Sequence, residues 1–235
     1  MLRRPGMSYF VTGTDTGVGK TLVSCALLHA LAAQGRRVAG FKPVAAGCEA
    51  DGRNEDAVAL LAASSMTLSY RQVNPYCFQP AIAPHIAAAQ AGERIEIAHI
   101  LAAYRELAAK ADVVVVEGAG GFRVPLNEEQ DSADLARELN LPVILVVGVR
   151  LGCLNHALLT AEAIAARGLV LVGWVANVLD AQMHALQDNV AALRERMDAP
   201  LLGTVPRMAQ PDARQAARQL DLCLLRNEQE NRAEG

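Results

Sequence analysis

The residues most suited to chemistry in this sequence form a loop rich in Gly and Thr, which spans Gly13–Thr21 and reads GTDTGVGKT. Glycines in such a loop let successive backbone N–H groups turn toward phosphate oxygens, and a helix that follows adds the positive end of its dipole. A lysine at the position of Lys20 reaches the β- and γ-phosphates of a nucleotide, and a hydroxyl at the position of Thr21 can bind Mg²⁺. The loop therefore predicts a binding site for nucleotide phosphates.

The loop departs from the strict phosphate-binding pattern at one position. That pattern places a Gly five residues before the Gly of Gly-Lys-Thr, where this chain has Thr14. A dinucleotide-binding fingerprint fits less well, because Leu22 stands where its third Gly should fall. The other alternative is a plain Gly-rich turn with a solvated lysine. The apolar run before the loop and the helical pattern after it favour the phosphate site.

Hydrophobic patterning sets this loop between a predicted strand at 9–11 and a predicted helix at 22–31. Further strands are expected at 37–41, 112–117, 142–147, 169–176 and 201–205. Further helices are expected at 54–61, 86–90, 97–110, 132–139, 155–166, 184–197 and 211–219, with irregular structure at 44–53 and 70–84. This alternation predicts an α/β fold of the phosphate-loop NTPase type, a doubly wound, mostly parallel sheet with helices on both faces.

The composition indicates a single well-buried domain over residues 1–235, since 52% of the residues are hydrophobic. The net charge of −3, without long runs of like charge, argues against nucleic acid or an anionic membrane as a partner. We find no signal peptide and no apolar segment long enough to span a membrane, and we expect a cytoplasmic protein. Residues 1–6 and 226–235 are expected to be flexible ends.

The five cysteines stand singly in the sequence, without a Cys-x-x-Cys pair. Several lie in apolar or helical stretches, where a reduced thiol acts as a small hydrophobic side chain. We therefore expect reduced cysteines in a reducing compartment.

Polar residues follow several of the predicted strands, and ligands of a doubly wound fold bind at this carboxyl edge. Lys42, Glu117, Asn177 and the pair 206–207 hold such positions. Because these ends meet at one edge of the sheet, we expect a composite site there.

Three charged residues near this edge each leave two interpretations open. Glu117 could help to hold Mg²⁺, or it could accept hydrogen bonds from the glycine loop that follows it. Asp56 could join it, or it could only stabilise the positive end of its helix. Lys42 could balance the charge of a transferred phosphoryl group, although a lysine at a strand end is often only solvated.

Besides the phosphate loop, the sequence contains GFKPV at 40–44, RNEDA at 53–57, VNPY at 73–76, PHI at 84–86, VEGAGG at 116–121, VVGVRLGCLNH at 146–156 and GWVAN at 173–177. Taken together, these segments resemble those of the dethiobiotin synthetases, which act in the penultimate step of biotin synthesis. These segments follow the family's order over nearly the whole chain, and the sequence is identified as a member of this family of ligases.

The resemblance implies a homodimeric enzyme that uses ATP as co-substrate and Mg²⁺ as cofactor. Its substrates would be ATP, carbon dioxide and diaminopelargonic acid, which is 7,8-diaminononanoate. Carbon dioxide would add to one amine to give a carbamate, whose oxygen would attack the γ-phosphate of ATP. The second amine would then close the ureido ring of dethiobiotin, with release of ADP and phosphate.

The resemblance also implies roles for individual residues. Catalytic roles fall on Lys42, Lys20 and Thr16, and the metal ligands would be Thr21, Asp56 and Glu117. The nucleotide would contact Gly17, Val18, Gly19, Lys20, Thr21, Leu22, Asp56, Glu117, Gly118, Ala119, Gly120, Asn177, Val178, Pro206, Arg207 and Met208. The diamine would contact Ala46 and, across the dimer interface, Leu151, Gly152 and Asn155.

Three positions depart from the family's pattern. Some members have a hydroxyl residue in place of Ala46, an Asp in place of Val178, and an aromatic residue in place of Arg207. These changes leave the expected reaction intact and bear on substrate contact and nucleotide selectivity.

A different class of protein is the main alternative, namely a nucleotide-switch ATPase of the septum-positioning or partition type. Such proteins usually carry an extra lysine early in the phosphate loop, where this chain has residues 14–16, Thr-Asp-Thr. An amide-forming ATPase related to cobyrinate diamide synthases would need a glutaminase domain, for which we expect no room in this chain.

Overall fold

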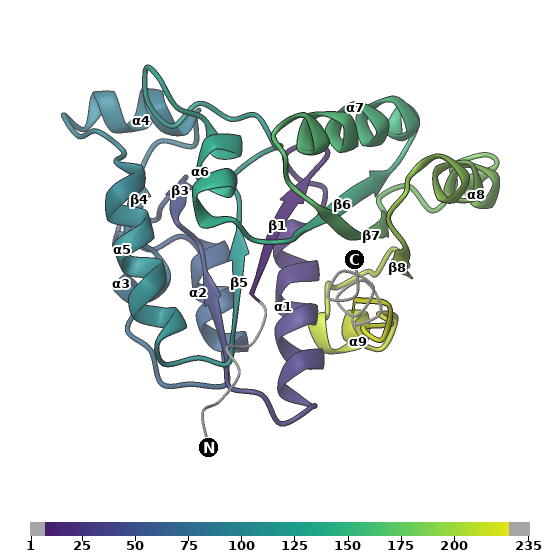
Figure 1. The fold of residues 1–235 in the computed structure, drawn as a ribbon, viewed down its shortest axis with the longest axis horizontal. Helices are drawn as coiled ribbons and strands as arrows, with labels where there is room; N and C mark the ends of the chain where they lie inside the picture. The colour runs from purple at the N-terminus through teal and green to yellow at the C-terminus, as the bar shows by residue number, and fades with distance from the viewer. Residues whose placement is uncertain (1–7, 226–235) are drawn as a thin grey trace.

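A six-stranded parallel sheet organises the chain in the computed structural model, which describes residues 8–225 (Figure 1). The strands are β1 (Tyr9–Gly13), β2 (Val38–Phe41), β5 (Val113–Glu117), β6 (Val143–Val149), β7 (Leu171–Val178) and β8 (Leu201–Val205). Their order is β2-β5-β1-β6-β7-β8, and each neighbouring pair is parallel. All six carboxyl ends therefore lie at one edge, with β1 between β5 and β6.

Helices cover both faces of this sheet, which confirms the predicted fold class. One face carries α1 (Lys20–Ala32), α2 (Glu55–Ala63) and α9 (Ala213–Ala217), and the other carries α5 (Ile97–Ala108), α6 (Ser132–Leu139), α7 (Cys153–Ala166) and α8 (Leu186–Arg196). A short helix, α4 (Pro84–Gln90), adds to the second face. Because successive strand residues point to opposite faces, Val11 packs with α1 and α2, whereas Phe10 packs with α5 and α6.

Capping residues in the sequence explain where two of the helices begin. The Asn54 side chain accepts hydrogen bonds from the N–H groups of Asp56 and Ala57 and so caps α2. Asp131 caps α6 in the same way and forms a capping box with Asp134. The helices and strands of the six-stranded sheet lie within about two residues of their predicted bounds, as expected for boundaries inferred from patterning.

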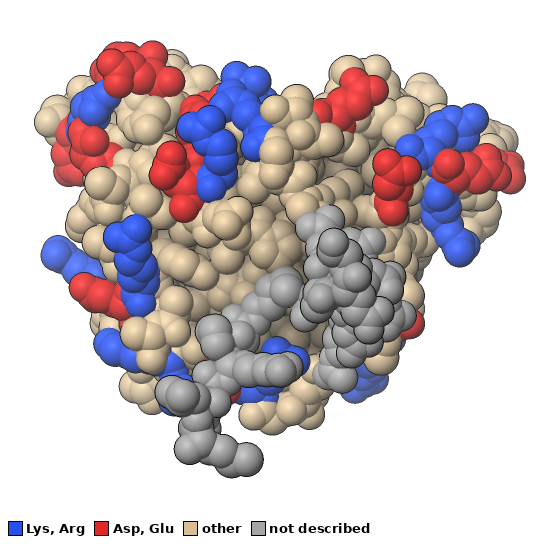
Figure 2. Space-filling view, in the orientation of Figure 1, with Lys and Arg blue, Asp and Glu red and all other residues tan. Residues whose placement is uncertain are grey.

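No helix among residues 8–225 is long and apolar enough to cross a membrane. On the face seen in Figure 2, acidic and basic side chains lie beside one another in mixed groups, in keeping with the small net charge of −3. The expectations for residues 1–6 and 226–235 concern segments outside the described residues.

Two segments that were expected to be irregular contain short regular elements. The three-residue strands β3 (Val44–Ala46) and β4 (Tyr76–Phe78) form a separate parallel pair, and a short helix, α3 (Tyr70–Val73), precedes β4. The prediction of irregular structure is thus wrong at 44–46, 70–73 and 76–78. Runs of three or four residues are too short to show a hydrophobic period, and the prolines around them favoured the wrong assignment.

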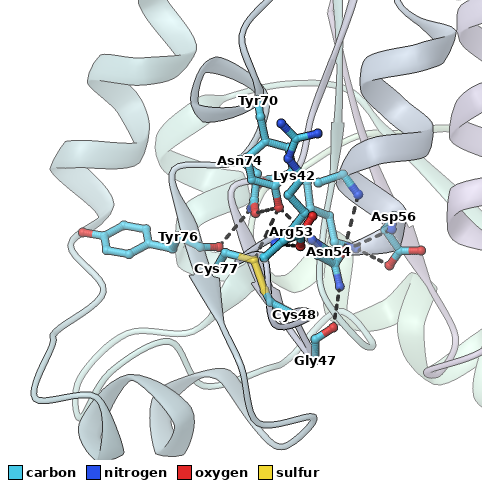
Figure 3. The surroundings of a disulfide bond; sticks show 12 residues. Lys42, Gly47, Cys48, Arg53, Asn54, Asp56, Tyr70, Asn74, Tyr76 and Cys77 are labelled. Carbon is cyan, nitrogen blue, oxygen red and sulfur yellow. Dashed lines mark hydrogen bonds and ion pairs between the residues drawn. A yellow bond between two sulfur atoms is a disulfide. The ribbon is translucent and has the colours of Figure 1, made fainter.

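The pairing of β3 with β4 also corrects the expectation for two of the cysteines. Cys48 and Cys77 form a disulfide with their Cα atoms 6.2 Å apart (Figure 3). They are 29 residues apart in the sequence, so no local pattern indicated the contact. Cys25 and Cys153 are free and buried, as expected of thiols used as small hydrophobic side chains, and Cys223 is free and exposed.

The disulfide predicts a stability that depends on reductant. Closing a segment of this length removes chain entropy from the unfolded state and stabilises the fold by about 3 kcal/mol. We expect the C48S/C77S double variant to unfold several degrees below the oxidised wild type in calorimetry, and reduction to lower the wild-type melting temperature similarly. Reductant should leave the melting temperature of the double variant unchanged, and an equal loss in both proteins would contradict this assignment.

Candidate active site at the carboxyl edge of the sheet

The Gly- and Thr-rich loop connects the end of β1 to the start of α1, as its sequence predicted. Gly17 and Gly19 have φ angles of 72° and 89°, which L side chains rarely adopt. No side chain among the described residues caps α1, and its first turn holds no acidic residue. The helix therefore presents its positive end and its first N–H groups to an anionic ligand.

Lys20 closes over this loop. Its ammonium donates a hydrogen bond to the carbonyl oxygen of Asp15 at 3.1 Å. Gly13 leaves room for the lysine stem, because a Cβ at Gly13 would lie 2.6 Å from Val18 Cγ2 and 3.1 Å from Lys20 Cγ. The ammonium group therefore lies at the loop, where a bound phosphate would replace its backbone partner.

Four polar side chains from four elements meet beside the loop. The buried ammonium of Lys42 lies 2.6 Å from Glu117 Oε1 and 3.1 Å from Asp56 Oδ2. The Thr21 hydroxyl lies 2.6 Å from Asp56 Oδ1 and 2.9 Å from Glu117 Oε1. Lys42 directly follows β2, and Glu117 ends β5, which lies between β2 and β1. The strand order thus brings together residues that the sequence separates by up to 96 positions.

The charges in this cluster stabilise one another. Burial alone would lower the pKa of Lys42, but the Glu117 and Asp56 carboxylates outweigh it and hold this pKa above its usual value. Burial would likewise raise the pKa of Asp56, but Lys42 and the Thr21 hydroxyl hold it below its usual value. Lys42 is therefore a cation and Asp56 an anion at neutral pH.

The oxygen atoms of the cluster suit a magnesium ion. The fully buried Glu117 has one carboxylate oxygen, Oε2, without a hydrogen-bond partner among the described residues. Together with Asp56 and the Thr21 hydroxyl it offers only oxygen ligands, which Mg²⁺ prefers. Within residues 8–225, no three His, Cys, Asp or Glu side chains form a group that could hold a metal ion. A metal ion here would therefore need the Thr21 hydroxyl and non-protein ligands besides the two carboxylates.

The loop that follows β5 lies against the phosphate loop. A Cβ at Gly120 would lie 3.5 Å from the Thr16 hydroxyl oxygen, and one at Gly121 would lie 3.7 Å from the Gly13 carbonyl oxygen. The carbonyl of Gly118 also lies 3.5 Å from the Lys42 ammonium. The structure therefore places Thr16 beside Gly120, and the Gly118 carbonyl beside the Lys42 ammonium.

The residues predicted for the adenine side lie at the ends of β7 and β8. Asn177 Nδ2 donates to the Val18 carbonyl at 2.8 Å and so contacts the phosphate loop directly. Val178 is the last residue of β7, and Arg207 donates to the carbonyl of Leu179 at 2.9 Å. The exposed Pro206 and the half-buried Met208 flank Arg207 after β8.

The residues predicted to contact the diamine lie in two places. Ala46 ends β3 and is half-buried. Leu151 follows β6 and is 93% exposed. Gly152 has a φ of 93° and directly precedes α7, and Asn155 is exposed in the first turn of that helix. The structure does not bring this second group into contact with the charged cluster within one chain.

Sequence reasoning missed several side chains beside the site. Arg150 lies 2.6 Å from the Asp15 carboxylate, which links the end of β6 to the phosphate loop. Tyr70 and Asn74 form hydrogen bonds behind Lys42 and Asn54. Asn74 lies within the VNPY segment of the resemblance, which was the available signal, but its partners are far away in the sequence.

Solved structures of about this size share the fold. The chain aligns with MinD in a MinC:MinD cell division complex of Aquifex aeolicus at a TM-score of 0.56 and 15% identity, over 96% of each chain. A ParA family ATPase from Chlorobium tepidum aligns at a TM-score of 0.55 and 13% identity, over 95% of this chain and 98% of that one. At such identities the likeness shows the fold alone. With the loop geometry, it defines an α/β protein of the phosphate-loop class.

Sequence comparisons give the family. A profile described as an AAA domain matches residues 7–215. The chain is 58% identical over 218 residues to the ATP-dependent dethiobiotin synthetase of Aromatoleum aromaticum, covering 92% of this chain and 97% of that protein. It is 57% identical over 225 residues to the Janthinobacterium enzyme of the same name, covering 93% and 95%. The chain belongs to the dethiobiotin synthetase family of ligases, and the resemblance inferred from its motifs is confirmed.

The environment of Lys20 predicts a pH dependence of nucleotide binding. Burial, and then the nearby Lys42 ammonium, lower the pKa of Lys20 to about 8. A phosphate would favour the charged form, so binding at higher pH must take up a proton. The affinity for ADP should therefore fall as the pH rises through about 8.

Isothermal titration calorimetry in two buffers of different ionisation enthalpy measures this proton uptake at about pH 8.5. The K20R variant is the control, because a guanidinium stays charged and should bind ADP without proton uptake. A wild-type affinity that stays constant across this range would contradict the lowered pKa.

Two glycines of the loop predict losses of different size on substitution. A Cβ at Gly19 would lie 2.1 Å from Asn177 Nδ2, whereas one at Gly17 would meet nothing within 4 Å. G17A should cost only the backbone strain of about 1–2 kcal/mol, but G19A must also displace the Asn177 amide. We expect G19A to lose clearly more thermal stability and ADP affinity than G17A. Equal losses would show that Asn177 is not held against the loop.

Proposed function

We propose that this chain is an ATP-dependent dethiobiotin synthetase that converts 7,8-diaminononanoate, carbon dioxide and ATP into dethiobiotin, ADP and phosphate. The observation that carries the proposal is the meeting of two lysines, two carboxylates and a hydroxyl at the phosphate loop, in a chain more than half identical to enzymes of this name. Lys20 and Lys42 are two of only three lysines in the sequence.

The reaction has three covalent steps. An amine nitrogen of the diamine attacks the carbon of carbon dioxide and loses a proton, which gives a carbamate. A carbamate oxygen then attacks the γ-phosphorus of ATP, and ADP leaves with the electrons of the broken bond. The second amine attacks the carbonyl carbon of the mixed anhydride, loses a proton and expels phosphate as the ureido ring closes.

The main obstacle to the second step is that a carbamate anion must approach a phosphate anion. Lys20, from the start of α1, would bind the β- and γ-phosphates together with the N–H groups of 17–22. Lys42 lies in the charged cluster, and its ammonium would contact both the carbamate and the γ-phosphate. Thr16, beside the 118–120 loop, would bind the carbamate. Positioning and charge balance supply the catalysis, and a carbamate needs no general base to attack phosphorus.

The carboxylates of Asp56 and Glu117 and the hydroxyl of Thr21 would hold Mg²⁺. Glu117 Oε2, which has no hydrogen-bond partner within residues 8–225, supports this role. A bound Mg²⁺ supplies charge neutralisation at the β- and γ-phosphates. In the structure, the Lys42 ammonium contacts the same two carboxylates, through Asp56 Oδ2 and Glu117 Oε1. The cluster would therefore hold two cations around one pair of acids.

The residues at β7 and β8 would hold the base of ATP. Asn177 would recognise adenine, with Val178, Pro206, Arg207 and Met208 around it. Position 178 is a Val where some members have an Asp, and the Arg207 side chain donates a hydrogen bond to the Leu179 carbonyl. Nucleotide selectivity would therefore rest mainly on Asn177.

The active form would be a cytoplasmic homodimer. Leu151 is a large apolar residue that is 93% exposed in one chain, which supports its burial against a second copy. Gly152 and Asn155 of that copy would bind the carboxylate of the diamine, while the backbone at Ala46 would contact its carbon chain. We further propose that residues 1–235 act as one domain.

Nucleotide-switch ATPases, the alternative class, share the fold of this chain but have low sequence identity to it. The MinD and ParA proteins align at identities of 13–15%, whereas dethiobiotin synthetases align at 55–58%. The loop also has residues 14–16 in place of an early lysine. The synthetase is therefore the function that the chain supports best.

Release of phosphate from ATP tests the proposal. With Mg²⁺ and bicarbonate present, release should require the diamine, and mass spectrometry should detect a cyclic urea. K42A should lower the rate by about 100-fold or more while ADP still binds, because the transition-state charge loses its partner. K110A is the matched control, since Lys110 is the exposed third lysine and lies before β5, at the opposite edge of the sheet. Equal ATP turnover without the diamine would refute the substrate assignment.

A further inference from the structure

A chain of hydrogen bonds lies behind the charged cluster and joins the backbones that carry Lys42 and Asp56 (Figure 3). The buried Asn74 side chain donates to the Lys42 carbonyl at 2.7 Å and accepts from the Tyr70 hydroxyl at 2.8 Å. The same hydroxyl accepts from the N–H of Asn54 at 2.8 Å. Asn54 in turn caps the first turn of α2, where it accepts from the N–H of Asp56 at 3.1 Å.

The Asn74 and Tyr70 side chains each donate and accept hydrogen bonds in this network. The second N–H of the Asn74 amide donates to the Tyr76 carbonyl at 2.9 Å, so both donors and the oxygen are engaged. The Tyr70 hydroxyl both donates and accepts, and burial raises its pKa, which keeps it protonated. Loss of the Tyr70 hydroxyl would remove the acceptor for the N–H of the buried Asn54, and loss of the Asn74 amide would remove a donor to the carbonyl of the buried Lys42.

The backbone of Lys42 depends on this region on both sides. Its carbonyl accepts from Asn74, and its N–H donates to the Val73 carbonyl at 2.8 Å. Lys42 lies just beyond the last residue of β2, so the sheet no longer fixes its position. The end of α3 fixes it instead.

The other end of this chain of hydrogen bonds fixes the position of Asp56. Asp56 lies in the first turn of α2. The Asn54 side chain caps this turn by accepting hydrogen bonds from the N–H groups of Asp56 and Ala57, and its amide donates to the Gly47 carbonyl at 3.3 Å. Asn54 itself is positioned by the Tyr70 hydroxyl. The distance of 3.1 Å between the Lys42 ammonium and Asp56 Oδ2 thus depends on the side chains of Tyr70 and Asn74, which contact neither the ammonium nor the carboxylate.

We propose that Tyr70 and Asn74 are positioning residues of the synthetase, which hold Lys42 and Asp56 at the spacing that the phosphoryl transfer needs. The inference rests on the proposed function for its kinetic consequences, but the geometric part stands on the hydrogen bonds alone. Within the described residues, neither side chain forms a hydrogen bond with the phosphate loop or with the charged groups of Lys42 and Asp56.

The kinetic test compares two tyrosine variants. Y70F removes only the hydroxyl at the network. The control, Y104F, removes the hydroxyl of Tyr104 on α5, which bonds Ser8 just before β1. We expect Y70F to lower kcat for diamine-dependent phosphate release by about tenfold while KM for ATP changes less than about twofold. Y104F should keep both constants. N74A should lose more than Y70F, and Y70F keeps the test valid if N74A fails to fold.

A spectroscopic test does not need activity. With three lysines in the chain, selective ¹³C labelling of lysine gives few signals, and K42A assigns that of Lys42 by its loss. Y70F should shift the Lys42 signal and leave that of Lys110 unchanged, whereas Y104F should shift neither.

These two tests separate the possible failures. If the wild type shows no diamine-dependent turnover but Y70F still shifts the Lys42 signal, the proposed function fails and the positioning role stands. If turnover is present, but Y70F matches Y104F in kcat and leaves the Lys42 signal in place, the positioning role is overturned.

Discussion

The ion pair between Lys42 and Glu117 is the interaction on which the rest of the site depends. Glu117 follows four valines at the end of β5 and is fully buried, so its carboxylate would be very costly to bury without a partner. The Lys42 ammonium lies 2.6 Å away and supplies the opposite charge. This pair requires β2 to lie beside β5, and the strand order of the sheet provides that neighbourhood. Thr21 and Asp56 then complete the cluster around the pair.

The same arrangement suits the chemistry of a carbamate. An enzyme that joins two anions must hold cations on both sides of the reacting atoms before the substrates arrive. Here Lys20 bonds a loop carbonyl, and Lys42 bonds two carboxylates that offset its charge, so both cations are in place. A substrate phosphate can replace the carbonyl partner of Lys20, while Lys42 keeps its two carboxylates. Pre-positioned charge of this kind costs little reorganisation during the reaction.

The sequence predicted the fold well because long apolar strands and capped helices leave clear patterns. Val113–Val116 and the Asn54 cap are examples, and both are found where they were expected. The short β3–β4 pair and the disulfide were missed, since three-residue strands have no period and the cysteine contact is made by tertiary structure. The motifs did predict which residues converge on Lys42. The hydrogen bonds of Tyr70 could not be predicted, because nothing local links a hydroxyl to a backbone 16 residues away.

The transfer of oxygen from carbon dioxide to phosphate tests the central claim most directly, namely that the cluster brings a carbamate oxygen to the γ-phosphorus. In this mechanism, the oxygen that attacks phosphorus leaves with it when the ring closes. With ¹⁸O-labelled carbon dioxide, and a reaction shorter than its exchange with water, the released phosphate should carry one labelled oxygen for each ring formed. Phosphate without label, at the same yield of dethiobiotin, would show that the carbamate is not phosphorylated and would contradict the account.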